Sequence, residues 1–487
     1  MHRWLDDGRG LQIVLLVFII HTLALSYLFN FTAVDDAFIS FRYADNLAKN
    51  RGFSYNEGRI VEGYSNFLWV LILSVFSLIG LDLNLASITL GLLLGILSIR
   101  LVYTSSRELF GWPVESRIIM CIIIAANPSI VFWFVSGMEI GLYAILSLSS
   151  FFLYLKGLKT GIFDQMLPLT LFLTALTRID GIIIMAVTIF HYIIMGRKGF
   201  QEDDKRIPKA WVLTSLTLYA AYSLWRISYY GQLMPNTVHA KVTLEMDYFI
   251  RGALFLAAFI LLNLTIISIN AFEHRKEVMK SRGNTYIKMM VLSGAATYIA
   301  IGGDHMPGRL FVPYFSMYVI LLAPALAKSV RHLRESVDNI ILVAVLSLLL
   351  SWVYFGPWFF WKSDVEAGRR CVGSWIRENL DENSTIAVVE AGIIPYYSGR
   401  RTIDMCGLTE PDVAGQKPRF GVFDILPGHD RCDLEYGLAA RPDYVSFFTA
   451  NITEHDGGYV SKSIKCGEGE VSFFLRKDSY DETMPGG

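Results

Sequence analysis

The chain has 487 residues, of which 53% are hydrophobic and only 18% are charged. Soluble globular domains carry about 25% charged residues, so this composition excludes an ordinary soluble protein and indicates a membrane protein. The net charge of −1 at pH 7 gives no reason to expect a nucleic-acid partner.

Apolar segments recur along the chain, and a membrane-spanning helix needs about 20 mostly apolar residues. The first segment, residues 11–29, is longer than a typical signal-peptide core and has no small-residue cleavage site, so we expect it to be retained. Residues 166–195 are interrupted by Thr177, Arg178 and Asp180, which predicts two short helices that meet at a polar elbow. The other candidate crossings are 66–82, 84–103, 117–134, 138–155, 210–228, 249–270, 288–302, 310–327 and 338–357. The pattern predicts a polytopic α-helical membrane protein with about 11 transmembrane helices.

Three basic clusters between the later segments predict the orientation of the chain. Loops rich in Lys and Arg stay in the cytoplasm, and these clusters lie at 197–209, 275–288 and 328–334. The segments on the opposite side of the membrane are then 229–248, 302–309 and everything after residue 358.

The loop at residues 30–65 and the polar residues Glu139 and Arg178 are also expected outside, because Lys156 and Lys159 mark the cytoplasmic side. Three full crossings between this loop and Glu139 would instead put Glu139 inside. Either one of these three segments is a surface or re-entrant helix, or one boundary is misplaced. The outside position agrees better with the other polar motifs, which then all lie on one face.

Residues 361–487 are interpreted as a soluble extracytoplasmic α/β domain, distinct from a membrane core at 1–360. Residues 365–380 have the spacing of an amphipathic helix, and the strand candidates are 385–390, 443–448 and 471–475. The cysteines of this part are Cys371, Cys406, Cys432 and Cys466. In an exported domain they predict two disulfides with three pairings open, and buried free thiols are the alternative. No Cys-x-x-Cys pair occurs, which argues against a zinc site.

Polar groups interrupt the predicted outer ends of the apolar segments, and two adjacent acids are the most informative. Asp35 and Asp36 lie where the chain leaves the first segment, and carboxylates at that depth cost free energy unless they face water, a cation or a partner. The accompanying groups are Arg42, Glu62, Tyr64, Asn66, Glu139, Arg178, Asp180, Asn236, Lys241, Asp304, His305 and Arg309. Because all of them are expected on one face, they predict a single site.

Glycosyl transfer from a lipid phosphate would need this combination of groups. A carboxylate must act on the acceptor hydroxyl as a general base or stabilise positive charge at the sugar carbon, and Asp35 or Asp36 suits that role. Cations must bind the phosphate, for which arginine offers a planar fork of donors. Arg178, Arg309 and Lys241 are the candidates.

Structural roles are the alternative for the acids. Asp35 and Asp36 could cap a helix, since Asp is favoured at that position. Glu139 could be a first-turn acid that the helix dipole favours. Asp304 and Arg309 could form a simple ion pair within their loop.

The remaining groups have similar alternatives. Arg178 could pair with Asp180 and stabilise the elbow between two helices. His239 and His305 could be metal ligands, although a lone loop histidine is more often an ordinary polar side chain. Tyr396 could support the contact between the two domains or touch the acceptor.

Five motifs carry a family resemblance, namely 35–43 (DDAFISFRY), 62–69 (EGYSNFLW), 302–313 (GGDHMPGRLFVP), 391–397 (AGIIPYY) and 404–411 (DMCGLTEP). In this order they resemble the glycosyltransferase-C superfamily and, more closely, the family of mycobacterial arabinofuranosyltransferase B. The resemblance implies a helical membrane core under an external α/β domain, and transfer of arabinofuranose from a decaprenyl-type phosphate to a surface glycan. Asp35 and Asp36 match the catalytic acidic motif of that family, whereas Glu410 stands where we expect Asp in much of it.

The sequence therefore predicts a membrane glycosyltransferase that transfers a sugar, by the resemblance arabinofuranose, from a polyprenyl-phosphate donor to a cell-surface glycan acceptor. It would lie in the plasma (inner) membrane with its site outside, and its further partner is membrane lipid. Asp35 and Asp36 are the predicted catalytic residues. The donor side is assigned to Arg42, Glu139, Arg178, Asp180, Asn236, Lys241, Asp304, His305 and Arg309, and the acceptor side to Glu62, Tyr64, Asn66 and Tyr396. The motifs assign no cofactor, and a divalent cation is left open.

Two other functions fit parts of the sequence. A transporter or flippase of a lipid-linked glycan would also carry charges within its membrane segments, but the sequence has no visible inverted repeat. A membrane anchor for an external binding domain would leave the polar groups near the membrane without an explanation.

Overall fold

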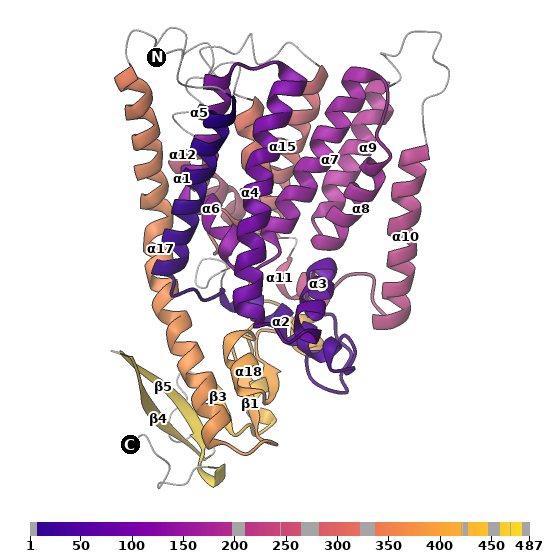
Figure 1. Ribbon diagram of the computed structural model, residues 1–487. Coiled ribbons are helices and arrows are strands. Elements are labelled where there is room, and N and C mark those ends of the chain that lie inside the picture. The colour runs from indigo at the N-terminus through magenta and orange to yellow at the C-terminus, as the bar shows by residue number, and fades with distance from the viewer. Residues whose placement is uncertain are drawn as a thin grey trace.

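The computed structural model describes residues 7–196, 210–243, 245–263, 282–321, 337–419, 421, 427–446, 458–467 and 469–479. Helices form a bundle, and a small sheet with short helices lies at one end of it, called the sheet end below (Figure 1). The basic clusters at 197–209 and 328–334, and most of the cluster at 275–288, lie outside the described residues. The predicted orientation in the membrane therefore stays a prediction.

Four of the described helices are long and apolar enough to cross a membrane, namely α1 (Asp7–Leu28), α4 (Leu83–Phe110), α7 (Ile140–Thr160) and α12 (Met246–Asn263). A fifth span results if α5 (Val114–Ala126) is joined to the bent piece formed by α6 (Pro128–Val131) and η1 (Phe132–Val135), which turns by 71°. Pro128 begins the bent piece because it has no N–H to continue the ladder of α5. The larger predicted number of crossings stays a prediction, because several apolar segments are only partly described.

The other helices of the bundle differ in length, and two of them confirm the predicted elbow. They are α2 (Asp35–Ala48), α3 (Phe67–Leu78), α8 (Met166–Thr177), α9 (Gly181–Gly196), α10 (Ala210–Tyr230), α11 (Asn236–Lys241), α15 (Arg282–Ala300), η2 (Arg309–Phe311) and α17 (Val337–Asn379). Arg178 has an extended backbone where α8 ends, directly before α9, so a polar turn separates two short apolar helices.

The short helix α3 explains why a simple count of crossings misplaces Glu139. Its 12 residues extend about 18 Å at 1.5 Å per residue, well below the hydrocarbon thickness of about 30 Å. In Figure 1, α3 lies beside α2 at the sheet end. This arrangement favours the surface or re-entrant helix of the two alternatives, and Glu139 then reaches the same end as Asp36.

Five strands form the sheet in the order β2-β1-β3-β5-β4. They are β1 (Thr385–Val388), β2 (Arg401–Asp404), β3 (Tyr444–Ser446), β4 (Tyr459–Cys466) and β5 (Gly469–Arg476), accompanied by α18 (Ile393–Ser398), α19 (Pro411–Ala414), α20 (Leu434–Ala439) and η4 (Lys477–Ser479). β1 pairs in parallel with β2 and β3, and β5 pairs antiparallel with β3 and β4. In this register Ile386 lies opposite both Thr402 and Tyr444. β1, β3 and β5 overlap the three predicted strands, whereas β2 and β4 have no predicted counterpart.

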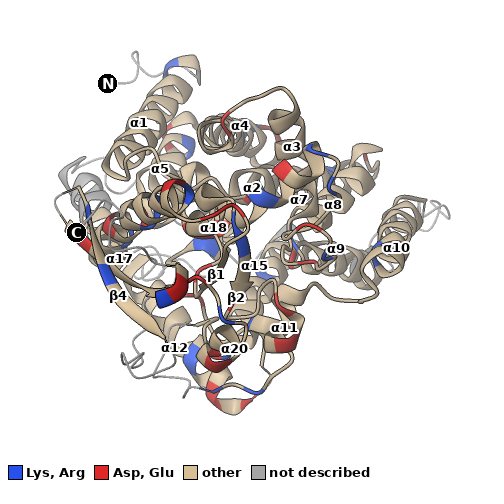
Figure 2. Ribbon diagram, turned by 90° about the horizontal axis from the view of Figure 1, so that it is seen from below, with Lys and Arg blue, Asp and Glu red and all other residues tan. Residues whose placement is uncertain are grey.

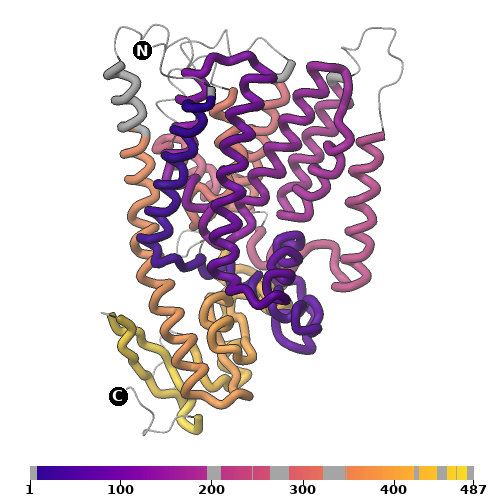
Figure 3. The backbone as a smooth tube through the Cα atoms, in the orientation of Figure 1, coloured from indigo at the N-terminus to yellow at the C-terminus, as the bar shows by residue number. Residues whose placement is uncertain are grey.

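The long helix α17 connects the bundle to the sheet without interruption (Figure 3). Val372 and Ile376 in its last turns pack against Ile386 and Phe473 of the sheet. The predicted amphipathic helix is the end of α17, and the predicted boundary at residue 360 falls inside it. The division into two domains stays a prediction.

Two disulfides join the cysteines of the sheet end, as the sequence predicted. Cys371–Cys466 ties α17 to β4. Cys406–Cys432 ties the segment after β2 to the segment before α20. The pairing that the sequence left open is thereby assigned.

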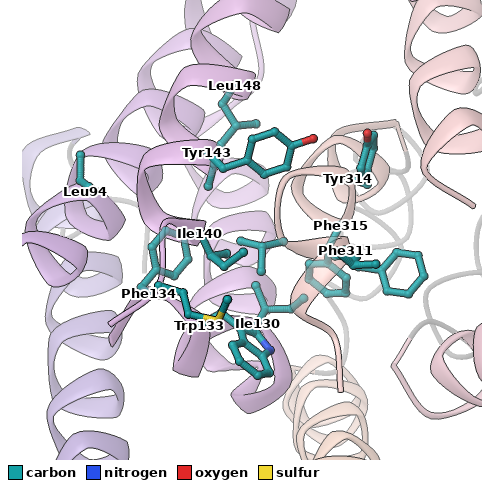
Figure 4. Packing of buried hydrophobic residues seen from close by; sticks show 14 of the residues in the cluster. Leu94, Ile130, Trp133, Phe134, Ile140, Tyr143, Leu148, Phe311, Tyr314 and Phe315 are labelled. Carbon is teal, nitrogen blue, oxygen red and sulfur yellow. The ribbon is translucent and has the colours of Figure 1, made fainter. Parts of the chain in front are cut away.

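Aromatic residues of the bent piece lie in the centre of the bundle core. Trp133 and Phe134 pack near α7 and the helix that follows Arg309 (Figure 4). The indole Nε1 of Trp133 donates a 2.8 Å hydrogen bond to the carbonyl of Pro307. Gly91 permits close approach of α4, since a Cβ there would lie 1.7 Å from the carbonyl oxygen of Phe134. This packing fixes the loop at 302–309 against the bent piece.

Candidate functional site

A cavity of about 190 Å³ lies where polar segments from distant parts of the sequence meet. Seen from the sheet end, Figure 2 shows acidic and basic residues of the short helices and loops around this part of the molecule. The predicted site residues that line the cavity are Asp36, Tyr64, Asn66, Glu139, Arg178, Asp180, Lys241, Asp304, His305 and Arg309. The fold therefore brings most of the predicted residues into one cavity, and their chemical roles stay predictions.

Asp36 lies at the start of α2 and faces two cations inside the cavity. Its Oδ2 is 3.1 Å from Nη1 of Arg309 and 3.6 Å from Nζ of Lys241. Burial by itself would raise the pKa of Asp36, but Lys241 and Arg309 outweigh it and hold that pKa well below the usual range. Asp36 is therefore an anion that is paired with two cations.

Asp35 has a different environment, since successive helical residues point about 100° apart. It does not line the cavity, and only 2% of it is exposed. Its Oδ1 accepts a 2.8 Å hydrogen bond from the amide of Ile393, and its own amide donates to Glu366. Burial raises the pKa of Asp35 to about 7, against the opposing charge of Arg369. Asp35 thus holds the sheet end onto α2.

Arg309 is oriented by its own loop. Its Nε and Nη2 donate to the two carboxylate oxygens of Asp304 at 2.8 and 3.0 Å. The preceding Gly308 has a φ of +80°, and a Cβ there would lie 2.1 Å from the carbonyl of Ser129, so only glycine fits. The predicted ion pair between Asp304 and Arg309 exists, and it lies within the cavity wall.

A second cluster of charged residues in the cavity, Glu139, Arg178 and Asp180, contains two carboxylates and one cation. Arg178 donates to Asp180 at 2.8 Å and to Glu139. Asn66 donates from Nδ2 to the other oxygen of Glu139 at 2.8 Å, and also to Ser40. Two carboxylates face the single guanidinium of Arg178, and this excess of negative charge disfavours a phosphate at this position.

Lys241 is the most available of the three predicted phosphate-binding cations. Arg178 and Arg309 are each only about a tenth exposed, and each pairs with two carboxylates. The Lys241 side chain is 33% exposed, and its ammonium contacts Asp36 at the long distance of 3.6 Å. A cation with a weak partner and access to a cavity is suited to bind an incoming anion.

Arg42 and Tyr396 lie outside this cavity and join α2 to the sheet end. Arg42 donates to the carbonyls of Pro395 and Arg400 at 2.9 and 2.8 Å. The ring of Tyr396 packs edge-to-face on Phe38 with centroids 5.3 Å apart. Both residues line a second cavity, of about 270 Å³.

Glu62 and Asn236 also lie outside the first cavity. Glu62 accepts a 2.8 Å hydrogen bond from the buried Arg226, and burial raises the pKa of Glu62 to about 7 against that opposing charge. Asn236 donates to the carbonyls of Gly407 and Leu408 at 2.7 and 2.9 Å. The contacts of Asn236 hold α11, which carries Lys241, against the sheet end.

A buried charge cluster behind Asp35 has no counterpart in the sequence-based predictions. Glu366 pairs with Lys362 at 2.9 Å and with Arg369 at 3.0 Å, and Arg369 also pairs with Glu390. In the sequence, Glu366 lies four residues after Lys362 and three before Arg369, and this spacing on a helix indicates ion pairs. Leu408, Pro427 and Gly428, which line the cavity from the sheet end, carry no such signal.

Metal binding was left open by the sequence. Within the described ranges, no group of three or more His, Cys, Asp or Glu side chains could hold a metal ion. His305 lines the cavity, and His239 is exposed on α11.

Comparisons of sequence add one match. Residues 362–478 match a family model described as Domain of unknown function (DUF8728). No protein of curated function matches the chain.

Comparisons of structure find solved proteins of similar fold. ArnT from Cupriavidus metallidurans, bound to undecaprenyl phosphate, has a TM-score of 0.58 and 13% identity over 82% of this chain and 85% of its own. The same protein in the apo state has a TM-score of 0.57 and 12% identity, over 96% of this chain and 99% of its own. The apo oligosaccharyltransferase of Archaeoglobus fulgidus has a TM-score of 0.50 and 14% identity, over 83% of this chain and 65% of its own. Identities this low inform on the fold alone, and they show that the chain has the glycosyltransferase-C fold predicted from its motifs.

Proposed function

We propose that this protein is a membrane glycosyltransferase that moves a sugar from a polyprenyl-phosphate carrier to a glycan acceptor, in the cavity beside Asp36. The observation that carries the proposal is the contact of Asp36 with Arg309 and Lys241 in one cavity. A carboxylate beside two cations is what the transfer of a sugar from a phosphate leaving group requires.

The comparison with ArnT supports the class of donor. That protein shares the fold and was solved with undecaprenyl phosphate bound. The cavity of the present chain lies where the apolar helices meet the sheet end, so a lipid tail could lie along the helices while its phosphate enters the cavity. Membrane lipid surrounds the helices in this proposal.

Binding of the phosphate would change the environment of Asp36. A phosphate that contacts Lys241 and Arg309 competes with Asp36 for the same cations, because both cations face it within 4 Å. Asp36 would then be released from part of its pairing at the moment when the sugar carbon develops positive charge. Its carboxylate is then available to stabilise that charge.

The acidic group at Glu139 suits the sugar better than the phosphate. Glu139 and Asp180 carry two negative charges against the single positive charge of Arg178. Carboxylate oxygens and the amide of Asn66 accept and donate hydrogen bonds to hydroxyl groups. We assign this group to the sugar hydroxyls, and Lys241 with Arg309 to the phosphate.

The identity of the sugar and the side of the membrane on which the cavity lies are inferred from the sequence alone. The resemblance to arabinofuranosyltransferase B favours arabinofuranose as the sugar and a cell-surface glycan as the acceptor. The positive-inside rule puts the cavity and the sheet end on the outer face of the plasma (inner) membrane.

The test uses purified protein in lipid vesicles with polyprenyl-phospho-arabinofuranose and a glycan acceptor, with product detected by mass spectrometry. Asp36→Asn is expected to reduce product formation by a factor of about 10² to 10⁴, because the charge at the reacting centre is lost. Asp35→Asn is the matched control and is expected to keep activity, because its amide oxygen can still accept from Ile393.

Full activity of Asp36→Asn would overturn the proposal. Movement of the intact lipid-linked sugar across the vesicle membrane without sugar transfer would instead favour the transporter. Mass spectrometry of the lipid that copurifies with the protein would identify the donor and decide between arabinofuranose and another sugar.

A further inference from the structure

His305 lines the cavity, and one of its ring nitrogens is already engaged in a hydrogen bond. Its Nδ1 is 3.0 Å from the carbonyl oxygen of Pro427. A carbonyl oxygen can only accept, so Nδ1 carries the hydrogen in this contact. In a neutral imidazole the other nitrogen, Nε2, then holds the lone pair.

The Nε2 atom has no competing partner among the described residues. The hydrogen bond of the His305 ring to Pro427 uses Nδ1 and leaves Nε2 free of that contact. The side chain is 10% exposed and lines the cavity. His305 therefore contributes to the wall of the cavity that contains Asp36 a ring in which Nε2 has no hydrogen-bond partner among the described residues.

The surroundings of His305 favour the neutral ring. Burial lowers the pKa of His305 well below the ordinary value, and the neighbouring His429 lowers it further, whereas Asp36 acts in the opposite direction. His429 packs edge-to-face on His305 with ring centroids 5.4 Å apart. The charged and titratable groups around the ring are Asp36 from α2, Asp304 and Arg309 from its own loop, Lys362 from α17 and His429 from the sheet end.

Asp36 is a poor base by comparison. A phosphate would take only part of the pairing of its Oδ2 with Arg309 and Lys241. Both cations stay in the cavity, and protonation of a carboxylate near two cations is unfavourable. A glycosyl transfer still has to remove a proton from the acceptor hydroxyl. The reaction therefore needs a proton acceptor near the acceptor hydroxyl, and a neutral ring nitrogen without a hydrogen-bond partner among the described residues can serve.

We propose that Nε2 of His305 is the general base of the transfer, and this inference rests on the function proposed above. The bond from the sugar carbon to the phosphate oxygen breaks, and a bond from that carbon to the acceptor oxygen forms. The hydroxyl proton moves to Nε2, and the polyprenyl phosphate leaves with the electron pair. Asp36 stays ionised and offsets the charge of the imidazolium.

The contact with Pro427 gives the sheet end a part in this chemistry. Pro427 lies outside the helical bundle, in the segment before α20. Its carbonyl selects the ring tautomer in which Nε2 can accept a proton. Docking of the sheet end therefore sets the protonation pattern of a residue in the bundle.

His305→Asn is the most informative variant, because the asparagine amide can still donate to Pro427 but has no nitrogen at the Nε2 position. We expect kcat to fall by a factor of about 10² to 10⁴, with the KM for the donor changed less than about twofold. His239→Asn is the matched control, since His239 is exposed and does not line the cavity. Unchanged kcat in a folded His305→Asn would overturn the base assignment.

Two further measurements separate a base from a structural residue. In His305→Ala, added imidazole is expected to restore transfer in proportion to its concentration, and no rescue would count against the base. In the wild type, kcat/KM is expected to fall as pH decreases through the lowered pKa of His305, and this limb is expected to vanish in His305→Asn. A wild type without any transfer would contradict the proposed function itself, whereas an active His305→Asn would contradict only the base.

Discussion

Nη1 of Arg309 lies 3.1 Å from Oδ2 of Asp36, although 273 positions separate the two residues in the sequence. The other nitrogens of the same guanidinium hold Asp304. One arginine thus joins carboxylates from two distant motifs, which only a planar fork with several donors can do.

Replacement of Arg309 by lysine is expected to reduce transfer strongly even though the charge is kept. A lysine ammonium cannot donate to Asp304 in two places and reach Asp36 at the same time. We expect kcat/KM to fall at least about tenfold, measured with the vesicle assay. An activity equal to the wild type would show that the charge alone matters and not the fork.

Lys241→Met is expected to weaken the binding of polyprenyl phosphate. The ammonium of Lys241 is the most exposed cation in the cavity wall, and loss of one charge contact to a phosphate changes affinity by about tenfold. Titration with undecaprenyl phosphate measures the Kd directly. Lys49→Met is the matched control, since Lys49 lies at the second cavity and its loss is expected to leave that Kd unchanged.

The raised pKa of Asp35 predicts how stability changes with pH. The pKa is about 7 in the folded protein and 3.8 in a free side chain, so the folded state binds more protons between these values. The contribution of Asp35 to stability therefore decreases as pH rises through this interval. Asp35→Asn removes the titration, and its melting temperature is expected to rise relative to the wild type from about pH 4 to about pH 8. A difference in melting temperature that stays constant over this range would contradict the burial of an ionisable Asp35.

The two disulfides are expected to have different effects when they are removed. Cys371–Cys466 closes a loop of 95 residues and Cys406–Cys432 one of 26. Stabilisation grows with the length of the closed loop, to roughly 3 to 5 kcal/mol for loops of this order. Replacement of Cys371 and Cys466 by serine is therefore expected to lower the melting temperature more.

The loss of activity, unlike the loss of melting temperature, is expected to be larger when the Cys406–Cys432 disulfide is removed. Cys406 and Cys432 join the segments that supply Leu408 and Gly428 to the cavity wall. Their replacement by serine is expected to reduce transfer at temperatures where the protein is still folded, while the Cys371 and Cys466 variant keeps its activity there. Equal losses of activity in both variants would show that the effect is one of general stability.

The sequence predicted the polar residues of the cavity because charged groups near a membrane are costly and therefore informative. Asp36, Glu139, Arg178 and Arg309 all belong to short polar motifs at the ends of apolar segments. What the sequence could not resolve was which of Asp35 and Asp36 lines the cavity. Asp36 lines it, whereas Asp35 contacts Ile393, which is far away in the chain and offers a backbone amide rather than a recognisable side chain.

The strands that the sequence did not predict are the two edges of the sheet. β2 and β4 lie at the ends of the order β2-β1-β3-β5-β4. Edge strands carry polar and charged side chains that discourage pairing with other chains. The exposed Arg401 in β2 and Lys465 in β4 are of this kind. Their pattern lacks the continuous apolar run by which β1 and β3 were recognised.

The unbroken α17 has a consequence for how relatives of this protein can vary. Its 43 residues amount to about 65 Å at 1.5 Å per residue, which is roughly twice the hydrocarbon thickness of a bilayer. The helix thus sets the distance and the rotation of the sheet relative to the helical bundle. Deletion of one residue would shorten it by about 1.5 Å and turn the sheet by about 100°, carrying Ile393 away from Asp35 and Pro427 away from His305. An inserted whole turn would keep the rotation but move the sheet by about 5.4 Å, so both contacts require the length of this helix to be kept.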